Sequence, residues 1–172
     1  MGDRFRRGLP GGAAVGRVLT LDQARDLRRR LRQEGRTLAV ANGHFDLVHV
    51  GHLRYLQAAR AAADHLLVAI NDDDSVARLK GPGRPLVPAA ERGELLCGFA
   101  AVDSVVVFSG DSPEPLLLDL QPELHCKGTD YGEPSRVPEY EAVRSYGGRT
   151  VLVGDPKDHS TRDLIAKARA LP

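Results

Sequence analysis

The sequence predicts a single α/β domain built around a parallel sheet of about five strands. Apolar segments without a polar alternation recur along the chain, and segments with helical periodicity separate them. Apolar strands of this kind are typical of a sheet that helices cover on both faces. With 172 residues, the chain is long enough for one such domain and its core. We therefore expect a doubly wound, Rossmann-like fold without internal repeats.

The strands are short apolar runs bounded by turn residues. The run Ser104–Phe108 is rich in β-branched residues, which favour extended backbone. Others end in turn-forming or acidic residues, as at Asn71-Asp72-Asp73-Asp74. The strands are expected at residues 37–41, 65–70, 104–108, 123–126 and 149–153.

The helices are indicated by apolar side chains at helical spacing and by their caps. Leu21, Leu27 and Leu31 stand among charged residues in the first helix, and Thr20 is placed to cap it. Pro88 suits the first turn of a later helix. The helices are expected at residues 21–32, 51–63, 88–101, 113–120, 138–146 and 160–170, with a short helix or turn at 75–80 and a loop at 81–85.

Composition excludes several classes of function. The net charge of +1 argues against a general nucleic-acid or membrane surface. Cys97 and Cys126 are too few for a disulfide framework, and their apolar surroundings indicate buried, reduced thiols. No stretch could span a bilayer, and the basic start is followed by no apolar segment of a secretory signal. We expect a cytoplasmic protein with a flexible leader over residues 1–17 and one domain over 18–172.

The stretch from Gly43 to His52 carries the strongest functional signal. It holds three of the chain's six histidines and two glycines, between an apolar run and a helical pattern. Glycines let the backbone turn and let a ligand approach its N–H groups. The start of the following helix adds unpaired N–H groups and a partial positive charge. This order predicts a phosphate site, with His49 and His52 on one side of the first helical turn.

Other interpretations of these histidines have less support from the sequence. An isolated histidine is most often structural, but two histidines flanking a glycine between strand and helix are not typical of that role. A zinc site needs at least three protein ligands, and His44 would have no cysteine or glutamate partner nearby. The glycine fingerprint of dinucleotide-binding proteins is absent, which argues against a nicotinamide enzyme.

The segment His49-Val50-Gly51-His52 resembles the H-x-G-H signature of the cytidylyltransferase-like nucleotidyltransferase superfamily. Further segments resemble the adenylyltransferase domains that act on D-glycero-β-D-manno-heptose 1-phosphate in ADP-heptose synthesis. The resemblance runs from about Val18 to the end of the chain. The segments that carry it are 41–46, 68–76, 78–85, Cys126-Lys127-Gly128-Thr129-Asp130-Tyr131 and Tyr146-Gly147-Gly148.

The resemblance implies transfer of AMP from ATP to a sugar 1-phosphate, with release of pyrophosphate. The sugar phosphate is already an anion, so the reaction requires no general base. Its catalytic residues are then His49 and His52 at the α-phosphate and Lys80 at the triphosphate. Magnesium is expected to arrive with ATP, without a metal site formed by the protein alone.

The resemblance also implies a set of nucleotide contacts. Arg92 contacts a phosphate or is a surface charge on its helix, and both readings stay open. Ser160 and Thr161 cap the last helix and bind phosphate, but Arg162 replaces the second threonine of the family pattern. The expected nucleotide-binding residues are Gly43, His44, Phe45, Gly51, Arg92, Lys127, Ser160 and Thr161.

Sugar contacts are expected from residues that follow the strands. Acidic residues there have structural alternatives: Asp130 as a turn residue, and residues 72–74 as a solvated run or a helix cap. His44 stands where heptose enzymes usually have cysteine, and Phe45 is expected in the core. The expected substrate-binding residues are Asp46, Asn71, Asp72, Asp130 and Tyr131.

Two alternatives to the heptose enzyme remain at this point. One is a cytidylyltransferase for glycerol 3-phosphate or an amino-alcohol phosphate, because no residue identifies the base. The other is a nucleotide-binding regulator without turnover, against which His49, His52 and Lys80 argue. We expect a homodimer, the most common assembly.

Overall fold

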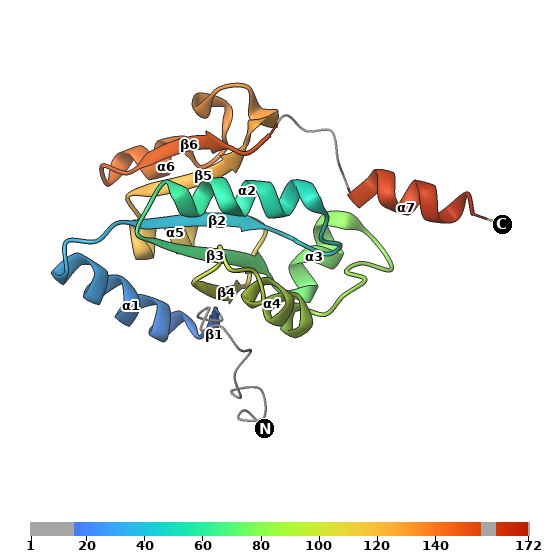
Figure 1. Cartoon of the computed structure of the whole chain (residues 1–172), viewed down its shortest axis with the longest axis horizontal. Helices are drawn as coiled ribbons and strands as arrows, with labels where there is room; N and C mark the ends of the chain where they lie inside the picture. The colour runs from blue at the N-terminus through green and yellow to red at the C-terminus, as the bar shows by residue number, and fades with distance from the viewer. Residues whose placement is uncertain (1–15, 156–160, 172) are drawn as a thin grey trace.

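The computed structural model describes residues 16–155 and 161–171, and it confirms the doubly wound α/β fold (Figure 1). All strands pair in parallel, in the order β1-β4-β3-β2-β5-β6. The strands are β1 (Arg17–Leu19), β2 (Leu38–Gly43), β3 (His65–Asn71), β4 (Ser104–Phe108), β5 (Leu124–Gly128) and β6 (Arg149–Val153).

Helices follow the strands as the sequence predicts, with differences at their ends. They are α1 (Leu21–Gln33), α2 (Val50–Ala61), α3 (Asp73–Lys80), α4 (Ala89–Cys97), α5 (Glu114–Leu120), α6 (Tyr140–Ser145) and α7 (Thr161–Arg169), with short 3-10 turns η1 (Thr129–Tyr131) and η2 (Pro134–Arg136). Thr20 caps α1 as predicted, and Gln23 completes a capping box. The helix predicted to reach residue 101 ends at Cys97, because Gly98 follows and the chain tightens into turns.

The sheet has six strands where the sequence predicted five. The additional strand, β1, is only three residues long and pairs with one edge of β4. Val18 at its centre is half exposed, so the strand has no continuous apolar pattern. So short an edge strand cannot be predicted from its own sequence; it is identified by its hydrogen bonds to β4. Residues 1–15 of the expected leader lie outside the described residues.

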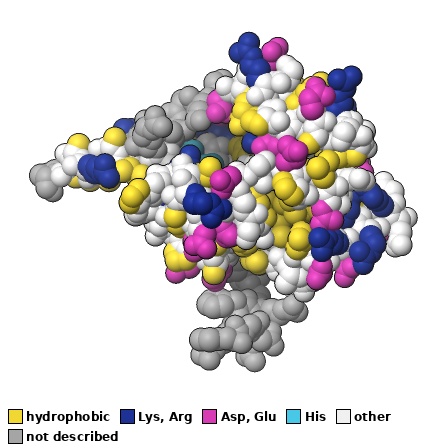
Figure 2. All heavy atoms as spheres, turned by 180° about the vertical axis from the view of Figure 1, so that it is seen from behind, with side chains coloured by type: hydrophobic (Ala, Val, Ile, Leu, Met, Phe, Trp, Pro, Cys, Tyr) yellow, Lys and Arg dark blue, Asp and Glu magenta, His cyan; other side chains and the backbone are white. Residues whose placement is uncertain are grey.

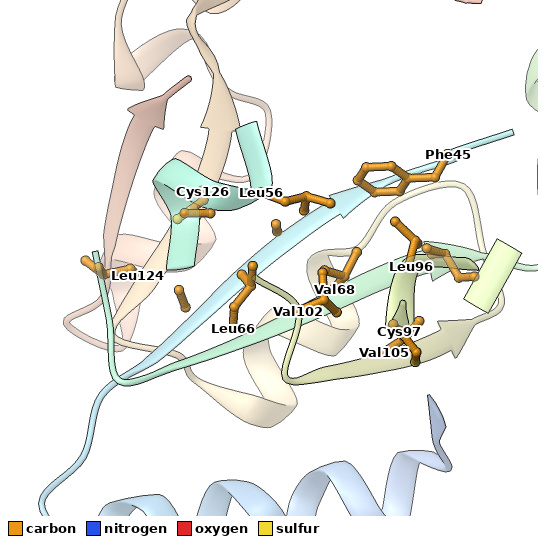
Figure 3. Packing of buried hydrophobic residues seen from close by; sticks show 14 residues of the cluster. Phe45, Leu56, Leu66, Val68, Leu96, Cys97, Val102, Val105, Leu124 and Cys126 are labelled. Carbon is orange, nitrogen blue, oxygen red and sulfur yellow. The ribbon is translucent and has the colours of Figure 1, made fainter. Parts of the chain in front are cut away.

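Two apolar layers enclose the sheet. On one face, α2 and α4 pack on alternate residues of the strands, with Leu56, Leu96 and Phe45 in the cluster (Figure 3). On the other face, α1, α5 and α6 pack on the remaining strand residues. Cys97 and Cys126 are buried free thiols, as predicted, and burial raises their pKa values to about 11 and about 12. None of the described helices is long and apolar enough to cross a membrane.

One polar pair lies inside the sheet. His125 of β5 is fully buried, and its Nε2 lies 2.9 Å from Oδ1 of Asn42 on β2. Burial, with a smaller contribution from the charge of Lys127, lowers the pKa of His125 to about 3. The ring is therefore neutral in the folded protein at neutral pH.

His125 should make the protein less stable in mild acid. Its pKa is about 3 in the folded chain, against 6.5 for the ordinary side chain, so only the unfolded chain gains this proton between those values. Stability therefore falls as pH decreases through that window, by about 2 kcal/mol from roughly pH 7 to roughly pH 5. Urea unfolding of wild type and His125→Gln at both pH values should show this extra loss in wild type alone. An equal loss in both proteins would contradict the assignment.

Candidate active site

A cleft of about 1120 Å³ lies at the carboxyl ends of the strands. It opens where β2 and β5 are neighbours, at which point the chain order reverses. Ligands of parallel sheets bind at such points. Pockets for one small ligand are typically about 300–1,000 Å³, so this cleft has room for two substrates. Figure 2 shows a histidine side chain inside a hollow of the surface, beside basic and hydrophobic side chains.

The two histidines of the motif meet at the first turn of α2. His49 precedes the helix with extended backbone, and His52 is its third residue. Their rings stack with centroids 3.8 Å apart, and the backbone N–H of His49 donates to Nδ1 of His52 at 3.4 Å. In a neutral His52, Nδ1 is then the acceptor and Nε2 carries the proton. Both residues line the cleft.

Phe45 connects this pair to the core. It is buried at a positive φ of 49°, and its ring lies 5.0 Å from that of His52. A side chain at Gly43 would come within 3.0 Å of the Phe45 ring. The ring therefore favours glycine at position 43, and Phe45 is the core residue that the sequence predicts. Gly51, also in the motif, lines the cleft at the start of α2.

Asp46 holds the loop that follows Lys80. Its buried carboxylate accepts from the backbone N–H groups of Leu86 and Val87 at 2.6 and 3.0 Å. It also pairs with Arg84 at 2.7 Å. Asp46 also lines the cleft, so it positions this loop, and its expected substrate contact stays a prediction. Lys80, at the end of α3, is exposed and lines the cleft.

Arg92 joins the loops around the cleft from inside the protein. It is fully buried, and Nε donates to the carbonyl of Val87 at 2.9 Å. Nη1 donates to the carbonyl of His44 at 2.6 Å, and Nη2 binds the carbonyl of Asn71 and a carboxylate oxygen of Asp73 at 2.9 and 2.7 Å. Arg92 does not line the cleft, so both the expected nucleotide contact and the surface alternative are wrong. It is a positioning residue.

The two expected contacts after β3 differ in position. Asn71 lines the cleft, and its side chain donates to the carbonyl of Gly110 at 2.9 Å. Asp72 lies outside the cleft lining and caps α3, accepting from the Ser75 N–H at 2.8 Å and the Ser109 hydroxyl at 2.5 Å. The predicted substrate contact of Asp72 is therefore wrong, and the cap alternative is confirmed.

His44 is a neutral side chain in the wall of the cleft. Burial, together with the charges of Lys80 and Arg92, lowers the pKa of His44 to about 4. Its Nε2 has no hydrogen-bond partner among the described residues. A neutral imidazole can donate or accept one bond there, which suits a polar group of a ligand.

The β5 side of the cleft gathers several polar groups. Lys127 is the last residue but one of β5, and its Nζ lies 3.4 Å from Oδ1 of Asn42 and 3.7 Å from a carboxylate oxygen of Glu139. The ring centroid of Tyr131 lies 5.3 Å from the same ammonium. Asp130 also lines the cleft, beside these groups in the chain. The predicted residues of this segment are thus brought together.

The start of α7 forms another wall. Thr161 lines the cleft, and its hydroxyl donates to the carbonyl of Leu47 at 3.1 Å. Ser160 and the side chain of Arg162 lie outside the described part of the structure. Within residues 16–155 and 161–171, no three histidine, cysteine or acidic side chains are grouped to hold a metal.

The sequence of this chain matches the model of a known family. The family model described as Cytidylyltransferase-like matches residues 40–166, which include both histidines and most of α7. The chain belongs to the cytidylyltransferase-like family. The H-x-G-H resemblance is thereby confirmed for a range that covers most of the domain.

Curated relatives of this cytidylyltransferase-like chain are longer proteins. The bifunctional protein HldE of Ectopseudomonas mendocina (strain ymp) is 45% identical over 152 residues, which are 88% of this chain and 32% of that protein. The bifunctional protein HldE of Geotalea uraniireducens (strain Rf4) is 44% identical over 153 residues, 89% of this chain and 31% of that protein. The chain thus spans about a third of these relatives.

A solved structure shares the fold of this family member. The lipopolysaccharide core biosynthesis protein from Thermoplasma volcanium GSS1 superposes with a TM-score of 0.61 at 22% identity. The match covers 72% of this chain and all of that one. At this identity the likeness supports the fold alone.

The structure adds cleft residues that sequence patterns did not reveal. Tyr55 of α2 lines the cleft, and its hydroxyl donates to the carbonyl of Cys126 at 2.6 Å, tying α2 to β5. Glu139 and Asp155 also line the cleft. Glu139 stands in no motif, and only its burial distinguishes it from the exposed acidic residues nearby.

Removing the Arg92 guanidinium should destabilise the fold strongly. Arg92→Met removes one donor from each of four buried or half-buried oxygens, of which Oδ1 of Asp73 keeps the Ala89 N–H as a donor. The free energy of unfolding should fall by about 3–5 kcal/mol. Arg78→Met is the control, because Arg78 pairs with Asp111 at exposed positions and should matter by less than about 1 kcal/mol. Urea unfolding measures both, and equal losses would contradict the positioning role.

Proposed function

We propose that this cytidylyltransferase-like chain transfers AMP from ATP to a sugar 1-phosphate and releases pyrophosphate. The preferred acceptor is D-glycero-β-D-manno-heptose 1-phosphate, and the product is ADP-heptose. The stacked pair of His49 and His52 at the start of α2, within a cleft that has room for two substrates, carries this proposal. The similarity to proteins named HldE and the sequence resemblance support the heptose.

The reaction needs alignment and charge stabilisation more than proton abstraction. An oxygen of the sugar phosphate attacks the α-phosphorus of ATP, and the bond from that phosphorus to the bridging oxygen of pyrophosphate breaks. The attacking oxygen is already anionic near neutral pH. Catalysis therefore depends on holding the two phosphates in line and on donors that stabilise charge at the α-phosphate.

The first turn of α2 supplies these donors. Because Nδ1 of His52 accepts from the His49 N–H, a neutral His52 carries its proton on Nε2, the nitrogen that donates to a phosphate oxygen in this proposal. His49 contributes its imidazole beside it, and the helix start adds backbone N–H groups and a partial positive charge. Lys80, exposed in the cleft, neutralises charge on the leaving pyrophosphate. Thr161 lies where α7 can add a phosphate contact.

Enzymes of this kind use a divalent cation with the nucleotide. We infer that magnesium enters with ATP, because phosphate oxygens are ligands that it prefers and the described residues supply no cluster of their own. The cation would neutralise phosphate charge.

We also propose a homodimer and a cytoplasmic location for the chain.

The substrate pair is tested by pyrophosphate release. ATP, CTP, GTP and UTP are each offered with heptose 1-phosphate, glycerol 3-phosphate and other phosphates, with magnesium present. We expect release above background from ATP with heptose 1-phosphate. Preference for CTP with glycerol 3-phosphate would establish the cytidylyltransferase alternative. Binding of ATP without release from any pair would identify a regulator.

His52→Ala should lower kcat at least about a hundredfold, because a donor to the charged transition state is lost. The KM for ATP should change less, since other groups still bind the triphosphate. Gln57→Ala, an exposed position on α2, is the matched control and should keep full activity. Thermal melting checks that both variants fold. Turnover of His52→Ala near the wild-type rate would defeat the proposed role.

A further inference from the structure

A buried pair of opposite charges lies in the cleft wall beyond the histidine motif. Glu139 stands directly before α6 and is only 5% exposed, although it lines the cleft. Its Oε2 lies 3.7 Å from Nζ of Lys127, whose side chain is 11% exposed. A glutamate so deeply buried is unusual unless its oxygens are bound.

The protein leaves part of this carboxylate unbound. Oε2 of Glu139 is buried and accepts no hydrogen bond from the described residues, and the side chain does not cap α6. Lys127 lies at ion-pair distance, and its ammonium is shared with Asn42 at 3.4 Å. The ion pair offsets the charge of Glu139 without completing its hydrogen bonds. A donor that enters the cleft would complete them.

The chemistry of the pair selects the kind of donor. A carboxylate only accepts hydrogen bonds, so its partner must carry O–H or N–H groups. An ionised phosphate offers only acceptors, so it cannot donate to Glu139, and the triphosphate does not suit this position. Because Lys127 balances the charge, the pair suits the neutral, hydroxyl-bearing part of a ligand. Tyr131 adds a ring face next to Lys127.

We propose that Glu139 is a specificity-determining residue that accepts hydrogen bonds from hydroxyl groups of a polyhydroxylated acceptor. Lys127 holds the carboxylate in place for this contact. The inference rests on the proposed transfer to a sugar phosphate. It assigns recognition of the sugar hydroxyls to a residue that lies outside every motif in the sequence.

The first test separates acceptor binding from nucleotide binding. Glu139→Gln should raise the KM for heptose 1-phosphate by about tenfold to a hundredfold, the range for hydrogen bonds to a charged group. The KM for ATP should stay within about twofold. Glu141→Gln is the matched control, since Glu141 lies on α6 with an exposed side chain. An unchanged KM for the acceptor, or an equal rise in both KM values, would overturn the proposal.

A second test identifies the contact itself. Acceptors that each lack one hydroxyl are compared in wild type and Glu139→Gln. If Glu139 accepts a hydrogen bond from a given hydroxyl, the acceptor that lacks this hydroxyl binds more weakly to wild type. The same acceptor shows little further loss of binding to Glu139→Gln, because the variant has already lost that hydrogen bond. A purely structural role predicts the same loss in both proteins for every analogue, and that result would reject the contact.

Two further measurements keep the outcome clear. Thermal melting checks that the variants fold. If Glu139→Gln is unstable, Glu139→Asp replaces it in the test. This variant keeps the negative charge on a shorter side chain and should also weaken acceptor binding. If wild type releases no pyrophosphate, the proposed function fails on its own. Calorimetric titration with heptose 1-phosphate alone then tests the inference: weaker binding to the variant supports it. Equal binding, or no binding to wild type, contradicts it.

Discussion

The buried guanidinium of Arg92 is the interaction on which the shape of the cleft depends. It binds the loop after β2 through His44, the end of β3 through Asn71, and the start of α3 through Asp73. A buried cation is stable only when its donors are satisfied. These segments therefore cannot separate without leaving a charge unbound inside the protein. Arg92 thus fixes the relative positions of the histidine motif and of the helix that ends in Lys80.

Phe45 links the hydrophobic core to the histidine motif. Its ring packs in the cluster with Leu56 and Leu96 (Figure 3). The same ring lies 5.0 Å from that of His52. Asp46, the next residue, fixes the loop after α3 through the backbone of residues 86 and 87. Adjacent residues of one loop therefore connect the core, the first turn of α2 and the loop after α3. The motif is conformationally demanding because it makes all three contacts in a few residues.

The sequence predicts the features that depend on residues close together in the chain. It does not predict contacts between residues that are far apart in the chain. The spacing of His49 and His52 sets their common face on one turn, and the apolar runs define five of the six strands. Arg92 reaches His44 across 48 residues, and a helical charge pattern cannot show that contact. In the sequence, Glu139 cannot be distinguished from the exposed acidic residues nearby, because its burial results from the fold. Asp72 was assigned to the substrate because the sequence does not distinguish a ligand contact from a cap on the next helix.

In the proposed function, the carboxyl ends of these strands form a site where a nucleotidyl group moves to a sugar phosphate. Incubation with ATP labelled at the α-phosphorus, heptose 1-phosphate and magnesium, followed by separation of the products, tests it most directly. We expect the label to appear in a nucleotide sugar, in an amount equal to the unlabelled pyrophosphate released. Label that stays in ATP, or that leaves as AMP without entering the sugar product, would contradict it.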